Sequence, residues 1–217
     1  MCLAYRKSGF PPVVRIPSPD PYEATKALDA GACGIISPYT ESVEEVEGLI
    51  AAVKTRPLKG VKVREYVTGR AKPESPLKEY LIGHNSEHLL LINIESPRGV
   101  ENLGKLLAYD EVDGIVVGPH DLTCSHDMPE AYEDPRFVDL VSSIIRRARE
   151  MGKGAGIHMT WQGNQQEIEW AKEGANIILH KADIILFAEY MRKELDSMRD
   201  ALGENDALSS ESANINI

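Results

Sequence analysis

Two acidic side chains stand where apolar segments of the sequence end. Glu95 directly follows Leu-Leu-Leu-Ile-Asn-Ile, and Asp121 comes four residues after Val117, in Val-Gly-Pro-His-Asp-Leu. Two carboxylates that share a partly buried site repel each other, so one must take up a proton or a cation must lie between them. Hard divalent ions such as Mg²⁺ and Mn²⁺ prefer oxygen ligands, with water and substrate in the remaining positions. Glu95 and Asp121 are therefore candidate metal ligands.

Each of these carboxylates also has a simpler interpretation. Glu95 precedes Ser96-Pro97, where the dipole of a starting helix favours an acid, and Asp121 could be an ordinary turn residue. Arg15 ends a segment otherwise made of Val and Ile. A guanidinium in such an interior needs an anion, so Arg15 indicates a carboxylate, phosphate or oxyanion ligand, or else an internal ion pair with another strand-end acid.

Three histidines lie near the ends of apolar segments as well: His120, His158 and His180. An imidazole titrates near neutral pH, so each could act as a base or as an orienting group. The alternative for each is an ordinary polar residue at the surface.

The elements that must position these groups follow a regular order. Short segments rich in Val, Ile and Leu alternate with longer amphipathic ones, which is typical of βα units and a parallel sheet buried on both faces. The predicted strands are Val13–Ile16, Gly34–Ser37, Leu89–Ile94, Gly114–Val117, Gly154–His158 and Ile177–His180. The candidate residues stand at or just past the carboxyl ends of these strands, the edge at which such folds bind ligands.

Helix-start signals separate the strands. Asp20 and Ser42 each precede a glutamate by three residues, as in a capping box, and Ser96-Pro97 and Asp134-Pro135 begin two more helices. Further helices are expected from Gly163 to Glu173 and from Asp183 to Leu202. The basic, polar stretch from Pro57 to Lys78 is interpreted as a long loop. No G-x-G-x-x-G or Walker loop follows a strand, and ionisable groups on several strands favour a barrel enzyme over an open nucleotide-binding sheet.

Composition excludes several classes of protein. The 217 residues, 42% of them hydrophobic, are expected to form one domain over residues 1–203, followed by a polar, disordered tail over 204–217. The net charge of −10 argues against nucleic acid, and no apolar run is long enough for a membrane helix. Three widely spaced cysteines and the lack of a secretory signal indicate a reducing compartment, so we expect a cytoplasmic protein.

Four stretches of the sequence carry a family resemblance. They read Val-Val-Arg-Ile-Pro; Leu-Asp-Ala-Gly-Ala with Gly-Ile-Ile-Ser-Pro; Ile-Asn-Ile-Glu-Ser; and Val-Asp-Gly-Ile-Val-Val-Gly-Pro-His-Asp-Leu. In order and spacing, from about Ala4 to Leu202, they resemble the HpcH/HpaI family of metal-dependent class II pyruvate aldolases. The glutamate paired with Gly-Pro-x-Asp-Leu is the specific part of this likeness.

The resemblance implies a fold and a reaction. The fold would be a (β/α)8 barrel of the TIM type, and the reaction would cleave or form a 4-hydroxy-2-oxo acid, giving pyruvate or a related 2-oxo acid plus an aldehyde. Glu95 and Asp121 would hold the divalent cation, Mg²⁺, Mn²⁺ or Co²⁺, that acts as a Lewis acid. Arg15 would steady the oxyanion, and Asp29 would pair with a catalytic histidine. Substrate contacts would come from Arg15, Asn93, Gly118, Pro119, His120 and Asp121.

The chain also departs from the family pattern. Asn93 stands where many members have a substrate-contacting glutamine, His120 where many have alanine, and Lys181 where many have glycine, so the distal part of the substrate could differ. The family barrel has two further strands before the one that ends in Arg15, and the second carries the catalytic histidine. Because the chain begins inside the helix that would follow them, we expect these first two strands to be missing and aldol cleavage to be impaired.

Two other functions stay open. One is a CoA-ester or citramalate lyase of the same superfamily, with a basic mouth from Lys62, Arg64, Arg70 and Lys72. The other is a truncated, non-catalytic paralogue that binds metal and oxo acid. The resemblance further implies a homo-oligomer, a dimer-based hexamer in which a C-terminal helix packs on a neighbour. The apolar residues of the last predicted helix agree with this: Ile184, Ile185, Leu186, Phe187, Tyr190, Met191, Leu195 and Met198.

Overall fold

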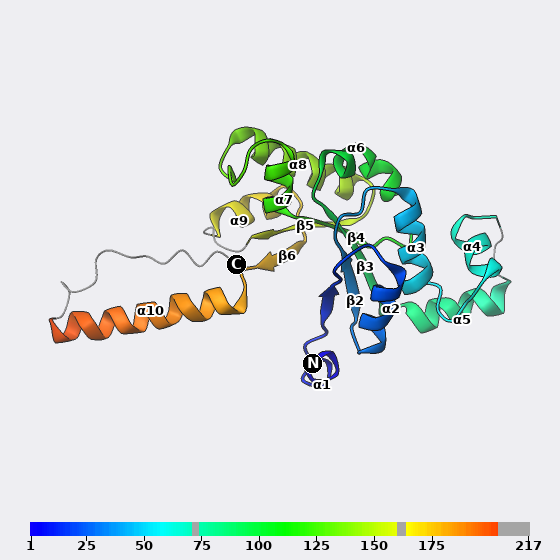
Figure 1. Cartoon of the computed structure of the whole chain (residues 1–217), viewed down its shortest axis with the longest axis horizontal. Helices are drawn as coiled ribbons and strands as arrows, with labels where there is room; N and C mark the ends of the chain where they lie inside the picture. The colour runs from blue at the N-terminus through cyan, green and yellow to red at the C-terminus, as the bar shows by residue number, and fades with distance from the viewer. Residues whose placement is uncertain (71–73, 160–163, 204–217) are drawn as a thin grey trace. The chain divides into compact units, whose positions relative to one another are not determined.

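The computed structural model describes residues 1–70, 74–159 and 164–203 (Figure 1). The described residues divide into two units, one of residues 1–159 with 164–179 and the other of residues 180–203. The first unit contains the sheet, apart from its last residue His180, and the covering helices, and the second contains the long helix α10, Asp183–Leu202. The tail expected over 204–217 lies outside the described residues.

Six strands form one sheet in the order of the sequence. They are β1 Val13–Arg15, β2 Gly34–Ser37, β3 Leu89–Ile94, β4 Gly114–Val117, β5 Gly154–Met159 and β6 Ile177–His180. The pairs from β1 to β5 are parallel. This arrangement confirms the predicted strands to within one residue at their ends and confirms an α/β fold with a parallel sheet. The two further strands expected before β1 stay a prediction.

The two faces of the sheet bury different residues. On the outer face, Ile35, Leu90, Ile92 and Ile115 are fully buried in the large core shared with the helices. On the inner face, a second cluster joins Ile36 of β2, Leu91 of β3 and Val116 of β4 with Ile177 and Leu179 of β6. The sheet curls into a half-barrel, and this smaller cluster lies on the face away from the large core (Figure 1).

Side-chain alternation then decides which polar residues point inward. Paired residues of neighbouring strands share a face, and successive residues of a strand alternate between faces. Arg15 pairs with Ile36 and Asn93 pairs with Val116, so both lie on the inner face. His158 lies two residues beyond Gly156, the partner of Val116, and shares that face. The inner face is apolar in its middle and polar at its carboxyl edge.

Four covering helices begin where their caps predict: α2 Pro21–Asp29, α3 Val43–Val53, α6 Pro97–Leu106 and α8 Pro135–Glu150. Helix α9, Gln165–Lys172, lies within the stretch expected to be helical. Ser42 and Glu45 form the complete capping box, with Ser42 Oγ accepting from the Glu45 N–H at 3.3 Å and Glu45 Oε2 accepting from the Ser42 N–H at 2.9 Å. Asp20 caps α2 through the Tyr22 N–H at 2.7 Å, but Glu23 pairs with Lys26 instead of closing the box.

The expectation of a long loop from Pro57 to Lys78 is wrong. The stretch interpreted as a loop contains α4, Val61–Val67, and the start of α5, Ser75–Asn85. Val67 packs against the main core and Leu81 is 2% exposed, so tertiary burial stabilises helices that the polar composition conceals. The Gly-Pro-x-Asp-Leu stretch is also helical, as α7, Pro119–Ser125, with Pro119 at a helix start that suits proline.

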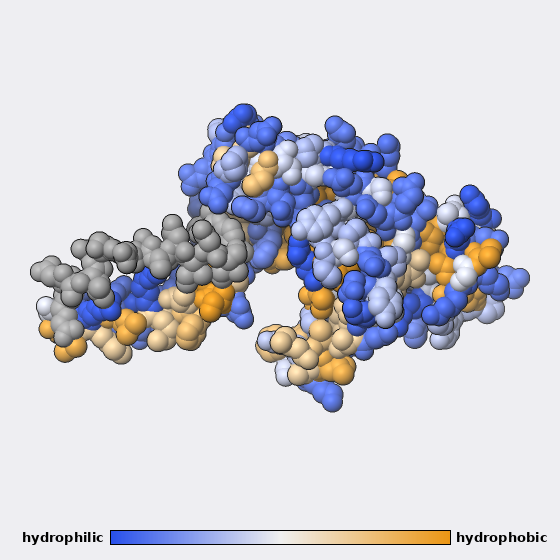
Figure 2. All heavy atoms as spheres, in the orientation of Figure 1, coloured by the Kyte–Doolittle hydropathy of each residue, from blue (hydrophilic) through white to orange (hydrophobic). Residues whose placement is uncertain are grey.

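The remaining helices are α1, Cys2–Lys7, and α10. Along α10 no residue is buried, and its apolar side chains Phe187, Tyr190, Leu195 and Met198 are all more than two-fifths exposed. Figure 2 shows hydrophobic residues at the surface along this helix. Among the described residues, no helix combines the length and the apolar character that crossing a bilayer requires.

Candidate active site

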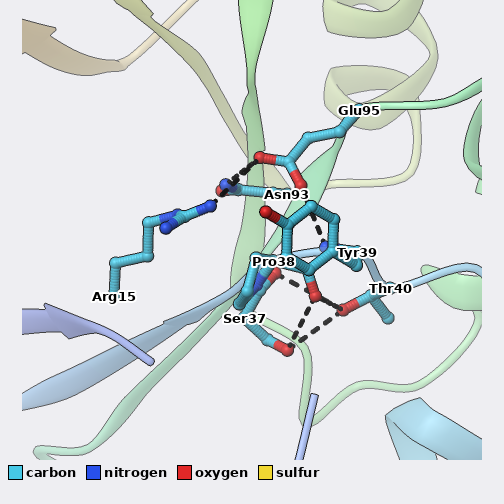
Figure 3. A network of polar contacts seen from close by, with 7 residues as sticks. All are labelled: Arg15, Ser37, Pro38, Tyr39, Thr40, Asn93 and Glu95. Carbon is cyan, nitrogen blue, oxygen red and sulfur yellow. Dashed lines mark hydrogen bonds and ion pairs between the residues drawn. The ribbon is translucent and has the colours of Figure 1, made fainter. Parts of the chain in front are cut away.

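Glu95 stands at the centre of a polar network just past the end of β3 (Figure 3). Its side chain is 4% exposed. Oε1 accepts a hydrogen bond from Asn93 Nδ2 at 2.7 Å, and Oε2 accepts one from the main-chain N–H of Tyr39 at 2.9 Å. Each oxygen thus has one donor, and each keeps a further lone pair for another partner.

The turn after β2 supplies the second of these donors. Tyr39 has a φ of 52°, in the left-handed region that non-glycine residues seldom adopt. Beside it, Ser37 and Thr40 are almost fully buried, and Thr40 Oγ1 lies 3.1 Å from Ser37 Oγ and 3.3 Å from the Pro38 carbonyl oxygen. These contacts hold the main chain in the conformation that directs the Tyr39 N–H to Glu95.

Arg15 reaches the same carboxylate from β1. Its Nη2 lies 3.9 Å from Glu95 Oε1, and its side chain is 49% exposed. The guanidinium carbon also lies 5.8 Å from the centre of the Tyr39 ring, within the range of a cation–π contact. Arg15 therefore neighbours a strand-end acid, as one interpretation expects, and is also half exposed to solvent. Its binding of an anionic ligand stays a prediction.

Asn93 is buried beneath Glu95 and is 6% exposed. Its Nδ2 is used on Glu95, while its Oδ1 is buried with no hydrogen-bond partner among the residues that the structure describes. An unsatisfied buried oxygen is costly and marks a position where a ligand or water group would be accommodated.

Gly118 connects Glu95 to the helix that carries Asp121. The Gly118 N–H donates to the Ile94 carbonyl at 3.2 Å, and a Cβ atom at Gly118 would lie 2.6 Å from Glu95 Oε1. The absence of a side chain therefore makes room for the carboxylate. Asp121 follows in the first turn of α7 and is exposed. Of the neighbouring residues, Pro119 begins α7, and exposed His120 has its Nδ1 3.2 Å from the Tyr132 hydroxyl.

His158 occupies the same edge on β5. Burial, and secondly the positive charge of Arg15, lower the pKa of His158 below its ordinary value of 6.5, while Glu167 acts in the opposite direction. This shift favours the neutral imidazole. His180 ends β6, as predicted.

The chain does not bring Asp29 to this edge. Asp29 ends α2, close before the amino end of β2, and its carboxylate is paired with Arg56. Because helices of βα units run back towards the amino ends of the strands, Asp29 and Glu95 belong to opposite edges of the sheet. Its predicted pairing with a catalytic histidine stays a prediction.

The donor set suits a hard divalent cation. Within the ranges 1–70, 74–159 and 164–203, no three His, Cys, Asp or Glu side chains gather into one site. The joint role of Glu95 and Asp121 as metal ligands stays a prediction. A carboxylate that is 4% exposed, with its nearest basic group 3.9 Å away, is only weakly compensated by protein charge. A cation with water and substrate oxygens in its other positions would complete the compensation.

The sequence analysis did not single out one residue of this network, Tyr39. Tyr39 contacts both Glu95 and Arg15, yet an isolated tyrosine after Ser-Pro suggests only a turn. Its position just past the carboxyl end of β2, the same edge that carries Arg15 and Glu95, was the available signal.

Comparisons with known proteins agree with this architecture. A family model described as HpcH/HpaI aldolase/citrate lyase matches residues 1–188. A hydroxypyruvate/pyruvate aldolase of Roseovarius nubinhibens is 29% identical over 87% of this chain and 72% of its own length. A 5-keto-4-deoxy-D-glucarate aldolase of Enterobacter sp. (strain 638) is 30% identical over 91% of this chain and 75% of its own length.

Solved structures show the same fold. An HpcH/HpaI aldolase from Desulfitobacterium hafniense DCB-2 superposes with a TM-score of 0.74 at 24% identity, covering 92% of this chain and 76% of its own. The CitE protein of Mycobacterium tuberculosis, in complex with magnesium and acetoacetate, has a TM-score of 0.51 at 17% identity, over 78% of this chain and 62% of its own. On the family match and the extent of the aldolase relatives, this chain belongs to the HpcH/HpaI aldolase/citrate lyase family of carbon–carbon lyases.

Proposed function

We propose that this protein is a lyase that uses a divalent cation to cleave or form a 4-hydroxy-2-oxo acid, with pyruvate or a related 2-oxo acid and an aldehyde as the smaller molecules. The observation that carries the proposal is the buried Glu95 carboxylate, held by two donors and open to a further partner. The relatives named above as aldolases of pyruvate and of a keto-deoxy sugar acid support this substrate class.

Glu95 and Asp121 would hold the cation. The ion, Mg²⁺ or Mn²⁺, or else Co²⁺, would supply Lewis-acid polarisation of the oxo-acid carbonyl. The close approach of Gly118 to Glu95 supports this assignment, because Asp121 follows Gly118 by three residues in the first turn of α7.

Arg15 would bind the developing oxyanion. A guanidinium offers two parallel donors to an oxyanion or carboxylate, and the half-exposed position of Arg15 leaves it accessible to a substrate entering at this edge. The buried oxygen of Asn93 and the exposed start of α7, with Gly118, Pro119 and His120, would contact the remainder of the substrate.

The test is pyruvate release. Parent protein with Mn²⁺ or Mg²⁺ should release pyruvate from 4-hydroxy-2-oxo acids, and Glu95→Gln or Asp121→Asn should abolish tight Mn²⁺ binding. Glu101→Gln, at an exposed position on α6, is the matched control and should bind Mn²⁺ like the parent. Unchanged Mn²⁺ affinity in either site variant would refute the metal assignment. Cleavage of a CoA thioester, without cleavage of the hydroxy-oxo acid, would show that the protein is a CoA-ester lyase and not an aldolase. Metal binding without either activity would indicate a non-catalytic binding protein.

A further inference from the structure

We propose that Tyr39 is a positioning residue that orients both charged groups of the proposed site, Glu95 through its main chain and Arg15 through its ring. The inference rests on the proposed function, because it assigns Tyr39 a part in that site.

The main-chain contribution follows from the turn after β2. The left-handed φ of 52° aims the Tyr39 N–H at Glu95 Oε2, 2.9 Å away, across 56 positions of sequence. Asn93 Nδ2 holds the other oxygen at 2.7 Å. Because each carboxylate oxygen accepts from a different donor, rotation of the Glu95 carboxylate about the Cγ–Cδ bond is fixed. The remaining lone pairs then point in a set direction, which is what a cation site requires of its ligands.

The ring makes the second contribution. The Arg15 guanidinium carbon lies 5.8 Å from the ring centre, so the aromatic face restricts a side chain that is otherwise half exposed. The ion pair of Arg15 with Glu95, at 3.9 Å, is too long to fix the guanidinium plane by itself. The ring thereby holds the guanidinium near Glu95 without occupying its hydrogen-bond donors, which stay open for an oxyanion.

Core packing does not account for Tyr39. The residue is 53% exposed, whereas the turn is anchored by its buried neighbours Ser37 and Thr40. A large aromatic residue at an exposed position with a left-handed main chain is locally unfavourable. The contacts of Tyr39 with Glu95 and Arg15 explain why a tyrosine occupies this position.

The two contributions separate by mutation. Tyr39→Leu keeps the N–H and removes the ring, so Mn²⁺ affinity should stay within twofold of the parent while kcat/KM for the oxo acid falls by roughly two- to tenfold. Tyr39→Phe should restore kcat/KM, because the ring and not the hydroxyl contacts Arg15. Tyr22→Leu, which removes an exposed ring beside Lys26 on α2, is the matched control and should leave both quantities unchanged.

Thr40→Val tests the main-chain contribution. The valine keeps the shape of the side chain but removes the hydroxyl beside Ser37 and Pro38, so the turn should relax and Mn²⁺ affinity should fall by about tenfold, with Thr40→Ser retaining it. Equal Mn²⁺ affinity in parent and Thr40→Val would overturn this half of the proposal. A Tyr39→Leu variant with parental kcat/KM, or one that loses Mn²⁺ binding, would overturn the other half.

A readout independent of catalysis distinguishes failure of the inference from failure of the proposed function. The side-chain NMR signal of Arg15, assigned by its loss in Arg15→Lys, should show a ring-current shift in the parent that Tyr39→Phe keeps and Tyr39→Leu abolishes. If the parent neither binds Mn²⁺ nor releases pyruvate, the proposed function fails. If the Arg15 signal is the same in Tyr39→Leu as in the parent, the positioning role fails whatever the activity.

Discussion

Replacing Gly118 by alanine tests the geometry of the proposed cation site with a single methyl group. The main chain of Gly118 has a φ of −92°, which any residue adopts, so the substitution introduces no backbone strain. Its only effect is steric, because the new Cβ would lie 2.6 Å from Glu95 Oε1 and 2.7 Å from Glu95 Cγ. Ordinary van der Waals contact begins at 3.4 Å, so Oε1 must retreat by about 0.8 Å.

That retreat would break the contact that orients the carboxylate. The hydrogen bond from Asn93 to Oε1 starts at 2.7 Å and would lengthen past the useful range. Loss of such a supporting contact to a metal ligand costs roughly 10–100-fold in metal affinity. Overpacking at a site of this kind lowers the free energy of unfolding by about 1–3 kcal/mol. Gly118→Ala should therefore bind Mn²⁺ roughly 10–100-fold more weakly than the parent. It should also unfold at a lower urea concentration.

The assay measures free Mn²⁺ by electron paramagnetic resonance while the parent and Gly118→Ala are each titrated with Mn²⁺. Urea unfolding is measured on the same samples. Gly104→Ala is the control, because Gly104 lies in α6 and a Cβ there meets nothing within 4 Å. It should keep parental Mn²⁺ affinity and gain up to about 1 kcal/mol of stability from the better helix propensity of alanine. Parental Mn²⁺ affinity in a folded Gly118→Ala would refute the claim that the approach of Gly118 positions Glu95.

Three further predictions concern charge, pH and assembly. Arg15→Lys should lower turnover by about 10²–10³ while leaving Mn²⁺ affinity near parental, since lysine keeps the charge and loses the planar fork; unchanged pyruvate enolisation would make Arg15 structural. The pKa of His158 is lowered in the folded protein, so the unfolded chain binds this proton more readily and the free energy of unfolding should fall as pH drops below 6.5. Urea unfolding of His158→Gln should depend less on pH, and a pH dependence equal to that of the parent would contradict this. The exposed apolar side chains of α10 should pack in a homo-oligomer that Phe187→Glu weakens, and a monomeric parent by light scattering at micromolar concentration would exclude it.

Local patterns in the sequence determined most of the framework. The six strands appear where runs of Val, Ile and Leu predict them, because strands buried on both faces cannot carry many polar residues. Ser42, Ser96 and Asp134 cap the helices that follow them, since the unsatisfied N–H groups of a helix start need a nearby side-chain oxygen. The placement of Arg15, Glu95 and His158 at one edge followed from strand direction alone.

Tertiary structure decided what local patterns could not. Helices α4 and α5 form in a polar stretch because Val67 packs against the main core and Leu81 is buried when the chain folds. Tyr39 meets Glu95 across 56 positions of sequence, and Gly118 makes room for the same carboxylate from the next strand. Asp29 lies at the other edge of the sheet, because it ends α2, and the helices of βα units run antiparallel to the strands. Such contacts depend on the register and curl of the whole sheet, which bring distant residues together only once the chain has folded.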